Sequence, residues 1–202
     1  MSDIALGRTT SGELVAEAEL SADSTGAAAV VEAVVEAAKE HGASLLWVHG
    51  GDLAAAGFTA TPGFVRLHAE HVLGVPTLTA PPPEAYGPLL ARCHLGLWGH
   101  HYVDAETARP PPGCTVLALQ DATGYVGMCR LWAGERRVDG PGVVPGSRTS
   151  ERYLQLLVAA CGVLGDGPVE VQTWGDTPDT IAAYESLGFE VVEHRRGWEL
   201  RL

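Results

Sequence analysis

The chain closes with the stretch Thr177–Leu202, TPDTIAAYESLGFEVVEHRRGWELRL, which decides the fold. Thr177 is a favourable N-cap and Pro178 suits the first helical position, so we expect a helix to begin there. Gly188 can adopt the left-handed conformation that ends such a helix. The buried face of this helix carries residues at regular spacing, Ile181, Tyr184 and Leu187. Tyr184 is therefore either a packing residue or a functional one.

The residues after Gly188 predict two short strands. Apolar and β-branched residues run from Phe189 to about Arg195, and a second run extends from Trp198 to Leu202. Arg196-Gly197 between them has the composition of a tight turn. The sequence therefore predicts that the chain ends on a hairpin.

A similar pattern occurs earlier in the chain, over residues 27–70, and its counterpart covers residues 152–202. Each stretch reads as an apolar helix, a glycine stop, an apolar strand, a short helix ending in Gly-Phe and a further strand. The matching landmarks are Gly42 and Gly165, Trp47 and Trp174, and the pairs Gly57-Phe58 and Gly188-Phe189. The similarity is one of pattern more than of identity, so chance is the alternative explanation.

A proline run in TLTAPPPEAYG, residues 77–87, disfavours both helix and central strand. We therefore place a boundary near residue 80 and expect two units, residues 1–80 and 81–202. In the second unit a helix is expected from Glu84 to about Gly99, and a hairpin is expected around a turn at Asp121–Gly124. The resulting order of strands and helices predicts an α/β fold, with a mixed central sheet and flanking helices.

Composition narrows the functional classes. The chain has 202 residues and a formal net charge of −12, which argues against nucleic acid as a partner. No apolar run is long enough to span a bilayer and the N-terminal residues do not resemble a signal peptide, so we expect a cytoplasmic protein with no membrane partner. The four cysteines show no paired spacing and lie mostly in apolar contexts, so buried thiols are expected and no metal site is.

The stretch GVVPGSRTSERYLQ, residues 142–155, is the candidate site. An apolar strand end passes through a Pro-Gly loop into a helix, and free backbone N–H groups at a helix start bind phosphate oxygens well. Arginines crowd this part of an otherwise acidic chain, which favours a common anion site. They are Arg130, Arg136, Arg137, Arg148 and Arg152. The alternative is that Thr149 or Ser150 only caps the helix.

This loop and the C-terminal stretch together resemble the acetyl-CoA-dependent N-acetyltransferase superfamily (GNAT). Its members carry V-x-P-x-x-R/Q-G-x-G-x-G/A and, further on, N-x-x-A-x-x-x-Y-x-x-x-G-F. The first motif is matched by Val143, Pro145 and Arg148, and the second by Tyr184 and Gly188-Phe189. The resemblance covers the second unit well from about Glu84 and the first unit loosely.

The resemblance implies a role for each matched position. The strand before the loop would bind the pantetheine arm of CoA through Val143 and Val144, and Tyr184 would protonate the departing thiolate. The remaining CoA contacts would come from the loop and from the start of the last helix. These are Arg148, Thr149, Ser150, Glu151 and Arg152 at the pyrophosphate, and Thr177.

Several family positions differ in this chain. Thr149, Glu151 and Tyr153 replace loop glycines that let the backbone approach a ligand closely. Thr177 and Thr180 replace the asparagine and alanine of the second motif. The first unit has Leu53 at the tyrosine position and no V-x-P-x-x-R, so it resembles a non-catalytic copy that completes the sheet or shapes the acceptor pocket.

Residues on the acceptor side are less clearly marked. Glu135, Asp176 and His100 are candidates by position for the base that an amine nucleophile needs. The adjacent pair His100-His101 does not suit a metal, because neighbouring side chains point apart. Aromatic residues that could wall an acceptor pocket are Trp98, Trp132 and Trp174.

These features together predict an acetyl-CoA-dependent N-acetyltransferase. The amine of a small molecule would attack the thioester directly in a ternary complex, with no metal involved. The alternatives are a non-catalytic acyl-CoA-binding or assembly module of the same fold, and other acyl-CoA chemistry such as O-acylation or decarboxylation. The oligomeric state stays open, with a homodimer as one candidate.

Overall fold

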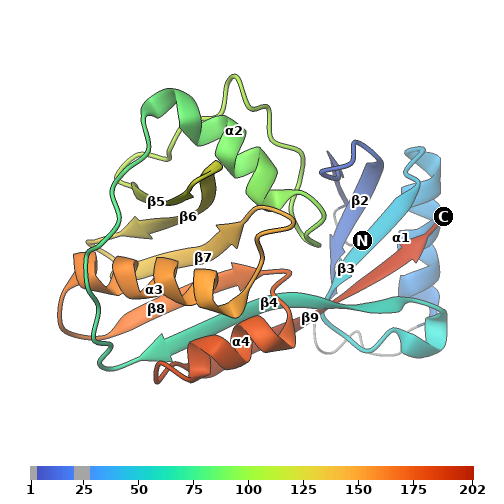
Figure 1. Cartoon of the computed structure of the whole chain (residues 1–202). Coiled ribbons are helices and arrows are strands. Elements are labelled where there is room, and N and C mark those ends of the chain that lie inside the picture. The colour runs from blue at the N-terminus through green and yellow to red at the C-terminus, as the bar shows by residue number, and fades with distance from the viewer. Residues whose placement is uncertain (1–3, 21–27) are drawn as a thin grey trace.

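The computed structural model describes residues 4–20 and 28–202. Over these ranges the chain is a mixed α/β structure, in which nine strands form one sheet and four α-helices pack against it (Figure 1). The elements follow in the order β1 (Ala5–Arg8), β2 (Leu14–Glu19), α1 (Ala28–Glu40), β3 (Leu45–His49), the 3-10 helix η2 (Ala54–Ala56), β4 (Thr59–Ala69), α2 (Pro83–His94), β5 (Thr115–Asp121), β6 (Gly124–Trp132), β7 (Arg137–Val143), α3 (Ser150–Leu164), β8 (Val169–Trp174), α4 (Pro178–Glu185) and β9 (Glu190–Arg201).

The sheet has the strand order β1-β2-β3-β9-β4-β8-β7-β6-β5. Leaving out β5, the order is symmetric about its centre. From one edge it reads β1-β2-β3 and then β9, and from the other edge it reads β6-β7-β8 and then β4, so that the series β1, β2, β3 and β4 corresponds to the series β6, β7, β8 and β9. In each series the first two strands pair antiparallel and the second and third pair in parallel. Each series also gives its last strand to the other, because β9 pairs with β3 and β4 pairs with β8. The element order predicted from the internal similarity is therefore confirmed.

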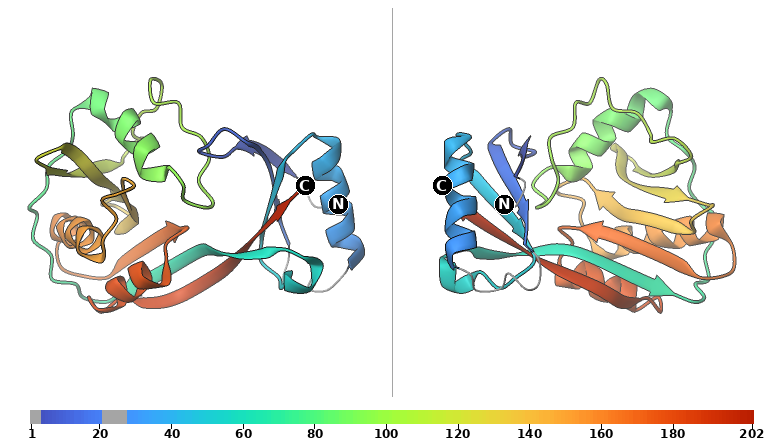
Figure 2. Two further views of the ribbon diagram at one scale, coloured as in Figure 1. Left: turned by 45° about the vertical axis from the view of Figure 1, so that its right-hand side comes forward. Right: turned by 180° about the vertical axis from the view of Figure 1, so that it is seen from behind.

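The long strands β4 and β9 join the two halves of the sheet. They pair antiparallel from Thr59–Glu199 to His68–Glu190, with irregularities after Thr61 and Arg66. Figure 2 shows both strands running between the two halves of the sheet, the N-terminal half that contains β1–β3 and the C-terminal half that contains β5–β8, and it places the C-terminus of the chain at the first of these. Residues 1–80 thus supply a strand to the sheet of residues 81–202, and the division into two units at residue 80 stays a prediction.

The predicted C-terminal hairpin is wrong, because β9 is one continuous strand from Glu190 to Arg201. Its second half pairs with β3, and Gly197 lies opposite His49. A side chain at Gly197 would collide with the indole of Trp98 and the hydroxyl of Thr61. This glycine therefore allows close packing at the junction of the two halves and does not form a turn.

Two helical layers enclose the sheet around the C-terminal half. Alternate residues of β6 point to opposite faces, so Cys129 and Leu131 belong to the core beneath α3 and α4, while Val126 and Met128 belong to the core beneath α2. In the N-terminal half, α1 packs on β2 and β3 through a separate core that includes Val34.

Most local predictions are confirmed. The helices α3 and α4 begin after Thr149 and Thr177, whose side chains accept the N–H groups of Arg152 and Thr180. The hairpin of β5 and β6 turns between Asp121 and Gly124. The helix expected over residues 84–99 is shorter, since α2 ends at His94 and Gly96 takes a positive φ of 71°.

The cysteines are free thiols. Three of them are buried and one is half-buried, as expected from their apolar contexts: Cys93, Cys129 and Cys161 in the first group and Cys114 in the second. Among the described helices, none combines the length and the apolar character needed to cross a membrane.

Candidate functional site

The parallel strands β7 and β8 pair for only part of their length. They are in register from Arg137–Glu170 to Asp139–Gln172, and no further pair between these two strands follows in the described chain, although β7 continues to Val143. A register irregularity between β6 and β7 falls at residues 140–141, where Pro141 has no N–H to give to a neighbouring strand. The two strands therefore part at their carboxyl ends, and the candidate site lies there.

Two cavities occupy this opening. The inner cavity has a volume of about 210 Å³ and lies beneath the end of α2, against β6, β7 and β8. The outer cavity has a volume of about 510 Å³ and lies between the start of α3 and the start of α4. Leu97 and Asp176 line both cavities. These two residues stand where one space meets the other.

Asp176 follows directly after β8 and is buried, with 6% of its surface exposed. The hydroxyl of Thr173 donates to its Oδ2 at 2.5 Å, and the hydroxyl of Tyr184 donates to the same oxygen at 3.1 Å. Burial raises the pKa of Asp176 to about 6, against which these two hydrogen bonds and the charge of Arg148 act. At neutral pH the carboxyl group is therefore ionised but close to its pKa.

Tyr184 lies on the buried face of α4, packed beside Ile181 and Leu187 as the spacing predicted. Its side chain is wholly buried and lines neither cavity. Burial, followed by the nearby charge of Asp176, raises the pKa of the Tyr184 hydroxyl well above its usual value. Its hydroxyl reaches the cavities only through Asp176, and its predicted role as the acid stays a prediction.

The predicted CoA residues fall into two groups. Arg148, Thr149, Ser150 and Thr177 line the outer cavity. Four others do not line it: Val143, Val144, Glu151 and Arg152. The structure therefore brings the loop and the start of α4 to one space, while the end of β7 lies behind it.

Arg148 is a central part of this loop. Its guanidinium donates to the carbonyl oxygens of Val143 at 3.0 Å, Cys93 at 3.2 Å and Leu95 at 2.6 Å. These bonds hold the end of α2 against the end of β7. The N–H of Val144 is also engaged, because it donates to the carbonyl of Val126 at 2.9 Å. The backbone groups that the resemblance assigns to the pantetheine arm thus have partners within the protein.

The five arginines do not form the common anion site that their crowding suggested. Each is engaged within the protein: Arg130 and Arg137 share Asp139, Arg137 also pairs with Glu135, Arg152 pairs with Asp121, and Arg136 and Arg148 bind backbone carbonyls. The crowding was misleading because the five side chains come from β6, β7, α3 and the loops before β7 and α3, and each meets a different set of acceptors. Arg148 alone among them lines the outer cavity.

Two histidines line the inner cavity, His94 at the end of α2 and His100 in the loop after it. Their ring centroids are 4.0 Å apart. His100 Nε2 lies 3.1 Å from the carbonyl oxygen of Trp174, which can only accept, so Nε2 carries the proton. Burial lowers the pKa of His94 to about 3 and that of His100 to about 4, so both rings are neutral at pH 7.

His101 points away from His100, as expected for neighbours in the chain, and its Nε2 lies 2.9 Å from a carboxylate oxygen of Glu17. Within the part of the chain that the structure describes, no group of three or more His, Cys, Asp or Glu side chains is placed to hold a metal ion. Of the three candidate bases, Asp176 and His100 line the inner cavity. Glu135 is exposed and bound to Arg137, so it is not part of the site.

Of the three tryptophans predicted to wall the acceptor pocket, two line the cavities and one does not. Trp174 lines the inner cavity and Trp98 lines the outer one, with their ring centroids 6.4 Å apart. Trp132 lies elsewhere, with the guanidinium of Arg137 4.4 Å from its ring. Trp98 and Trp174 also contact His49 of the N-terminal half, so this half forms the far wall behind the two tryptophans.

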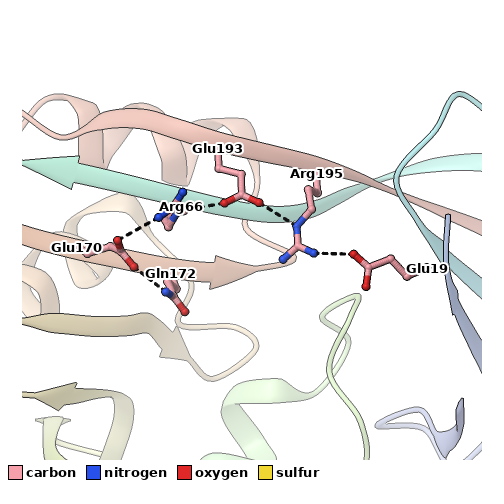
Figure 3. A network of polar contacts seen from close by, with 6 residues as sticks. All are labelled: Glu19, Arg66, Glu170, Gln172, Glu193 and Arg195. Atoms are coloured by element: carbon pink, nitrogen blue, oxygen red, sulfur yellow. Dashed lines mark hydrogen bonds and ion pairs between the residues drawn. The ribbon is translucent and has the colours of Figure 1, made fainter. Parts of the chain in front are cut away.

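A row of charged side chains extends from the inner cavity across the sheet (Figure 3). Gln172, which lines the cavity, donates to Glu170 at 2.6 Å. From Glu170 the contacts alternate in sign across β4 and β9 to β2, through Arg66, Glu193, Arg195 and Glu19. No sequence pattern predicts this row, because its members come from four different strands and their proximity depends on strand order.

His94 and Thr173 were also missed. Thr173 lies three residues before Asp176, so its contact carries a local signal that can be found in a sequence. His94 lies at the end of a helix whose length was overestimated, and its place depends on where α2 ends. The site therefore combines residues with a local signal and residues that only the tertiary structure brings together.

No sequence-defined protein family matches this chain, and no curated protein matches it. Solved structures of similar fold do match. The GCN5-related N-acetyltransferase from Anabaena variabilis is 10% identical with a TM-score of 0.51, covering 98% of this chain and 58% of that one. The enzyme of the same description from Sphaerobacter thermophilus is 13% identical with a TM-score of 0.50, covering 99% and 76%.

A third GCN5-related N-acetyltransferase, from Kribbella flavida, is 13% identical with a TM-score of 0.50 and covers 93% of this chain and 80% of that chain. At such identities the likeness concerns the course of the backbone and says nothing of substrates. The fold of this chain is that of the GNAT acetyltransferases.

Proposed function

We propose that this chain transfers an acetyl or other acyl group from CoA to the amine of a small molecule, by direct attack in a ternary complex. The observation that carries the proposal is the meeting of two cavities at Asp176, where β7 and β8 part. A two-substrate reaction needs two binding spaces that share one reacting point. The likeness in fold to N-acetyltransferases supports the same reaction class.

The outer cavity suits CoA. Exposed Thr149 and Ser150 stand at the start of α3, where unpaired backbone N–H groups favour phosphate oxygens. Thr177 faces the same cavity from the start of α4. The Val143 carbonyl, which the resemblance assigns to the pantetheine arm, already accepts from Arg148, and the arm would bind it best with the guanidinium turned away. The freed guanidinium would then be available to a phosphate.

The inner cavity suits the acceptor. Its volume of about 210 Å³ is below the roughly 300 Å³ at which pockets for drug-sized ligands begin, so it admits a small amine or the end of a longer one. Neutral His94 and His100 present no positive charge to repel an amine. Cys93 and Cys129 also line this cavity, but burial raises the pKa of both thiols, so neither is a ready nucleophile. Direct attack by the amine requires no acyl-enzyme.

We also propose that the N-terminal half is a degenerate copy of the C-terminal one. The exchange symmetry of the strand order supports this, as does Leu53 at the tyrosine position. Its β3, paired with β9 of the C-terminal half, completes the sheet behind Trp98 and Trp174. Its role is to shape the acceptor side, with no transfer of its own.

A second candidate function is binding of acyl-CoA without catalysis. Two observations favour it: the Val143 carbonyl is already bonded to Arg148, and Tyr184 is closed off from both cavities. The loop threonine and glutamate at the family's glycine positions point in the same direction. The two candidates differ in whether an amine is consumed.

Thermal unfolding in the presence of acetyl-CoA, followed by an amine screen that monitors CoA release, tests the proposal. A ligand that binds only the folded state stabilises it by about 2.7 kcal/mol at a hundredfold excess over Kd. We expect acetyl-CoA to raise Tm and at least one small amine to release CoA. A raised Tm with no amine-dependent release would favour the binding module, and an unchanged Tm at millimolar acetyl-CoA would overturn both.

A further inference from the structure

Asp176 differs from other carboxylates of the site in how its two oxygens are used. Thr173 and Tyr184 both donate to Oδ2. Oδ1 has no hydrogen-bond partner among residues 4–20 and 28–202. It nevertheless retains some solvent-accessible surface, unlike the fully buried unpaired atoms of the described chain. Asp176 lines both cavities, so Oδ1 is the carboxylate oxygen left free for a molecule bound in them.

We infer that Asp176 is the catalytic residue that carries the proton from the acceptor amine to the sulfur of CoA, and that Tyr184 and Thr173 position it. The inference rests on the proposed function and gives Tyr184 a different part in it. Tyr184 is closed off from the cavities, so it reaches the reacting atoms only through this carboxylate.

The step balances with one proton carrier. The lone pair of the neutral amine forms the C–N bond at the thioester carbonyl, and the amine proton moves to Oδ1 of the ionised Asp176. The C–S bond then breaks and its electron pair leaves on sulfur. Oδ1 returns the same proton to that sulfur, so the products are the amide and CoA thiol, and the carboxylate is restored. No other acid, base or oxidant is required.

The environment of Asp176 suits a group that both takes and returns a proton. A carrier works best when its pKa is near the working pH, and burial brings the pKa of this carboxyl to about 6. The titratable and charged groups around it come from each neighbouring element. They are Tyr184 and Asp179 on α4, Tyr153 on α3 and Arg148 in the loop before it, and His94, His100, Arg130 and Asp139 around the inner cavity.

The chain contains a matched control. Asp52 follows β3 in the sequence GGD, as Asp176 follows β8 in the sequence WGD. Asp52 is exposed, and its Oδ1 accepts the nearby N–H of Ala54 at 3.3 Å. Asp176→Asn and Asp52→Asn therefore make the same chemical change at corresponding places in the two halves. Asparagine retains an oxygen that can accept from Thr173 and Tyr184.

The first experiment measures CoA release with an amine found in the screen. We expect Asp176→Asn to lower kcat by about 10² to 10⁴-fold, the range for a general acid or base, while acetyl-CoA still raises its Tm. Asp52→Asn should behave as the parent. An Asp176→Asn protein that binds acetyl-CoA and retains the parental kcat would overturn the inference and leave the proposed function standing.

Tyr184→Phe distinguishes positioning from direct acid catalysis. Its hydrogen bond lowers the pKa of Asp176, so removing it should move the acid limb of kcat/KM from near pH 6 to higher pH. Above that limb, kcat should fall by less than in Asp176→Asn. Thr173→Val should shift the limb in the same direction. A Tyr184→Phe deficit as large as that of Asp176→Asn, with the limb unmoved, would return the acid role to Tyr184.

A binding measurement covers the case in which no amine in the screen reacts. Calorimetric titration with acetyl-CoA at pH 6, in buffers of different ionisation enthalpy, reports protons exchanged on binding. The phosphate monoester of CoA also titrates at about pH 6 and contributes alike to all variants. We therefore expect fewer protons exchanged in Asp176→Asn than in the parent and in Asp52→Asn, because the thioester would sit beside Oδ1. Equal proton exchange in all three proteins would overturn the inference, and a parent that binds no acetyl-CoA would remove the proposed function and this inference together.

Discussion

The two halves of the molecule contain the same parallel pair of strands joined by a helix, but only one pair is open. In the N-terminal half, β2 and β3 stay in register over their whole shared length, from Val15–Leu45 to Glu19–His49. In the C-terminal half, β7 and β8 part after Asp139–Gln172. The cavities described above lie at the open pair, so the site arises from a local failure of pairing within a common architecture.

The loops after the two pairs show the same contrast. Asp52 is exposed and accepts the N–H of Ala54, whereas Asp176 is buried and held by Thr173 and Tyr184. Gly140 packs so closely on Thr173 that a side chain there would collide with its hydroxyl. The C-terminal half therefore combines an opened backbone with a tightly packed carboxylate, and the N-terminal half has neither.

Separating the halves should have the largest effect. A fragment of residues 82–202 lacks β4, which supplies Val65, Leu67 and Ala69 to the core beneath α3 and pairs with both β8 and β9. Burial of a Val or Leu side chain contributes about 1.5 to 3 kcal/mol, and a whole domain is stable by only about 5 to 15 kcal/mol. We expect the fragment to be insoluble, as measured by the soluble fraction after expression.

Co-expression of residues 1–81 provides the control for this experiment. If the shared strands are the cause, the two fragments together should restore soluble protein with the circular dichroism spectrum of the full chain. A soluble, monodisperse fragment 82–202 that binds acetyl-CoA on its own would show that the two halves are independent units.

The two aspartates should differ in how they link stability to pH, which is the next largest effect. The folded pKa of Asp176 is raised from 3.8 to about 6, so the folded state holds a proton that the unfolded state releases. Its ionisation therefore costs stability as pH rises from about 4 to 6, by roughly 2 to 3 kcal/mol at about 1.4 kcal/mol per pKa unit. Asp176→Asn should become more stable than the parent above pH 6 and lose this advantage below pH 4.

Urea unfolding at pH 4 and pH 7 measures this difference, with Asp52→Asn as the control. Asp52 is exposed, so its variant should follow the parent at both pH values. An Asp176→Asn protein with the same offset from the parent at pH 4 and pH 7 would show that the carboxyl is not perturbed by burial. The expected result would mean that this site trades stability for a carboxylate near its pKa.

Local signals predicted much of this structure, and contacts between distant residues account for what they missed. The caps at Thr149 and Thr177 and the stops at Gly165 and Gly188 lie within one turn of the helices they bound, so a sequence displays them. Arg196-Gly197 likewise has the local composition of a turn, but pairing with β3 and β4 keeps β9 extended there.

The candidate site, like the fold, was predicted where the signal is local and missed where it depends on distant residues. Asp176, His100 and the loop were named from position and motif. The partners of Arg148 in α2 and just after it lie 55 and 53 residues away, and no short pattern connects them. The arginine crowding was misread for the same reason, because sequence proximity says nothing of the carbonyl or carboxylate that each side chain meets across the sheet.

A third prediction concerns the junction of the halves. Gly197→Ala places a methyl group against the Trp98 indole and the Thr61 hydroxyl, where the described structure leaves no space. Overpacking of this kind costs about 1 to 3 kcal/mol, and one methyl group is expected at the lower end of that range. Tm should fall, and intrinsic tryptophan fluorescence should report a changed environment for Trp98.

Gly134→Ala is the control for Gly197→Ala, because a methyl group at Gly134 would meet nothing within 4 Å. Its Tm should stay close to that of the parent. A Gly197→Ala protein as stable as Gly134→Ala would mean that the two halves are loosely packed where β3 and β9 meet, and that the N-terminal half does not set the position of Trp98.

The smallest effect is expected at Glu151, where a negative charge occupies a family glycine position at the start of α3. The charge favours the helix dipole but opposes a phosphate nearby, and it is exposed, so solvent and salt weaken both effects. Glu151→Gln removes the charge and retains the side-chain length. We expect it to tighten CoA binding by about two- to threefold at low salt, within the range of exposed charge interactions. Glu32→Gln makes the same change on α1 in the N-terminal half and should leave CoA affinity unchanged.

Arg148→Ala, measured beside these variants by calorimetry, should lower the affinity for CoA if the guanidinium turns from its carbonyls to the phosphates. Equal affinity in the parent, Glu151→Gln and Arg148→Ala would place the pyrophosphate away from this loop, and the open half would then owe its function to the cavities alone.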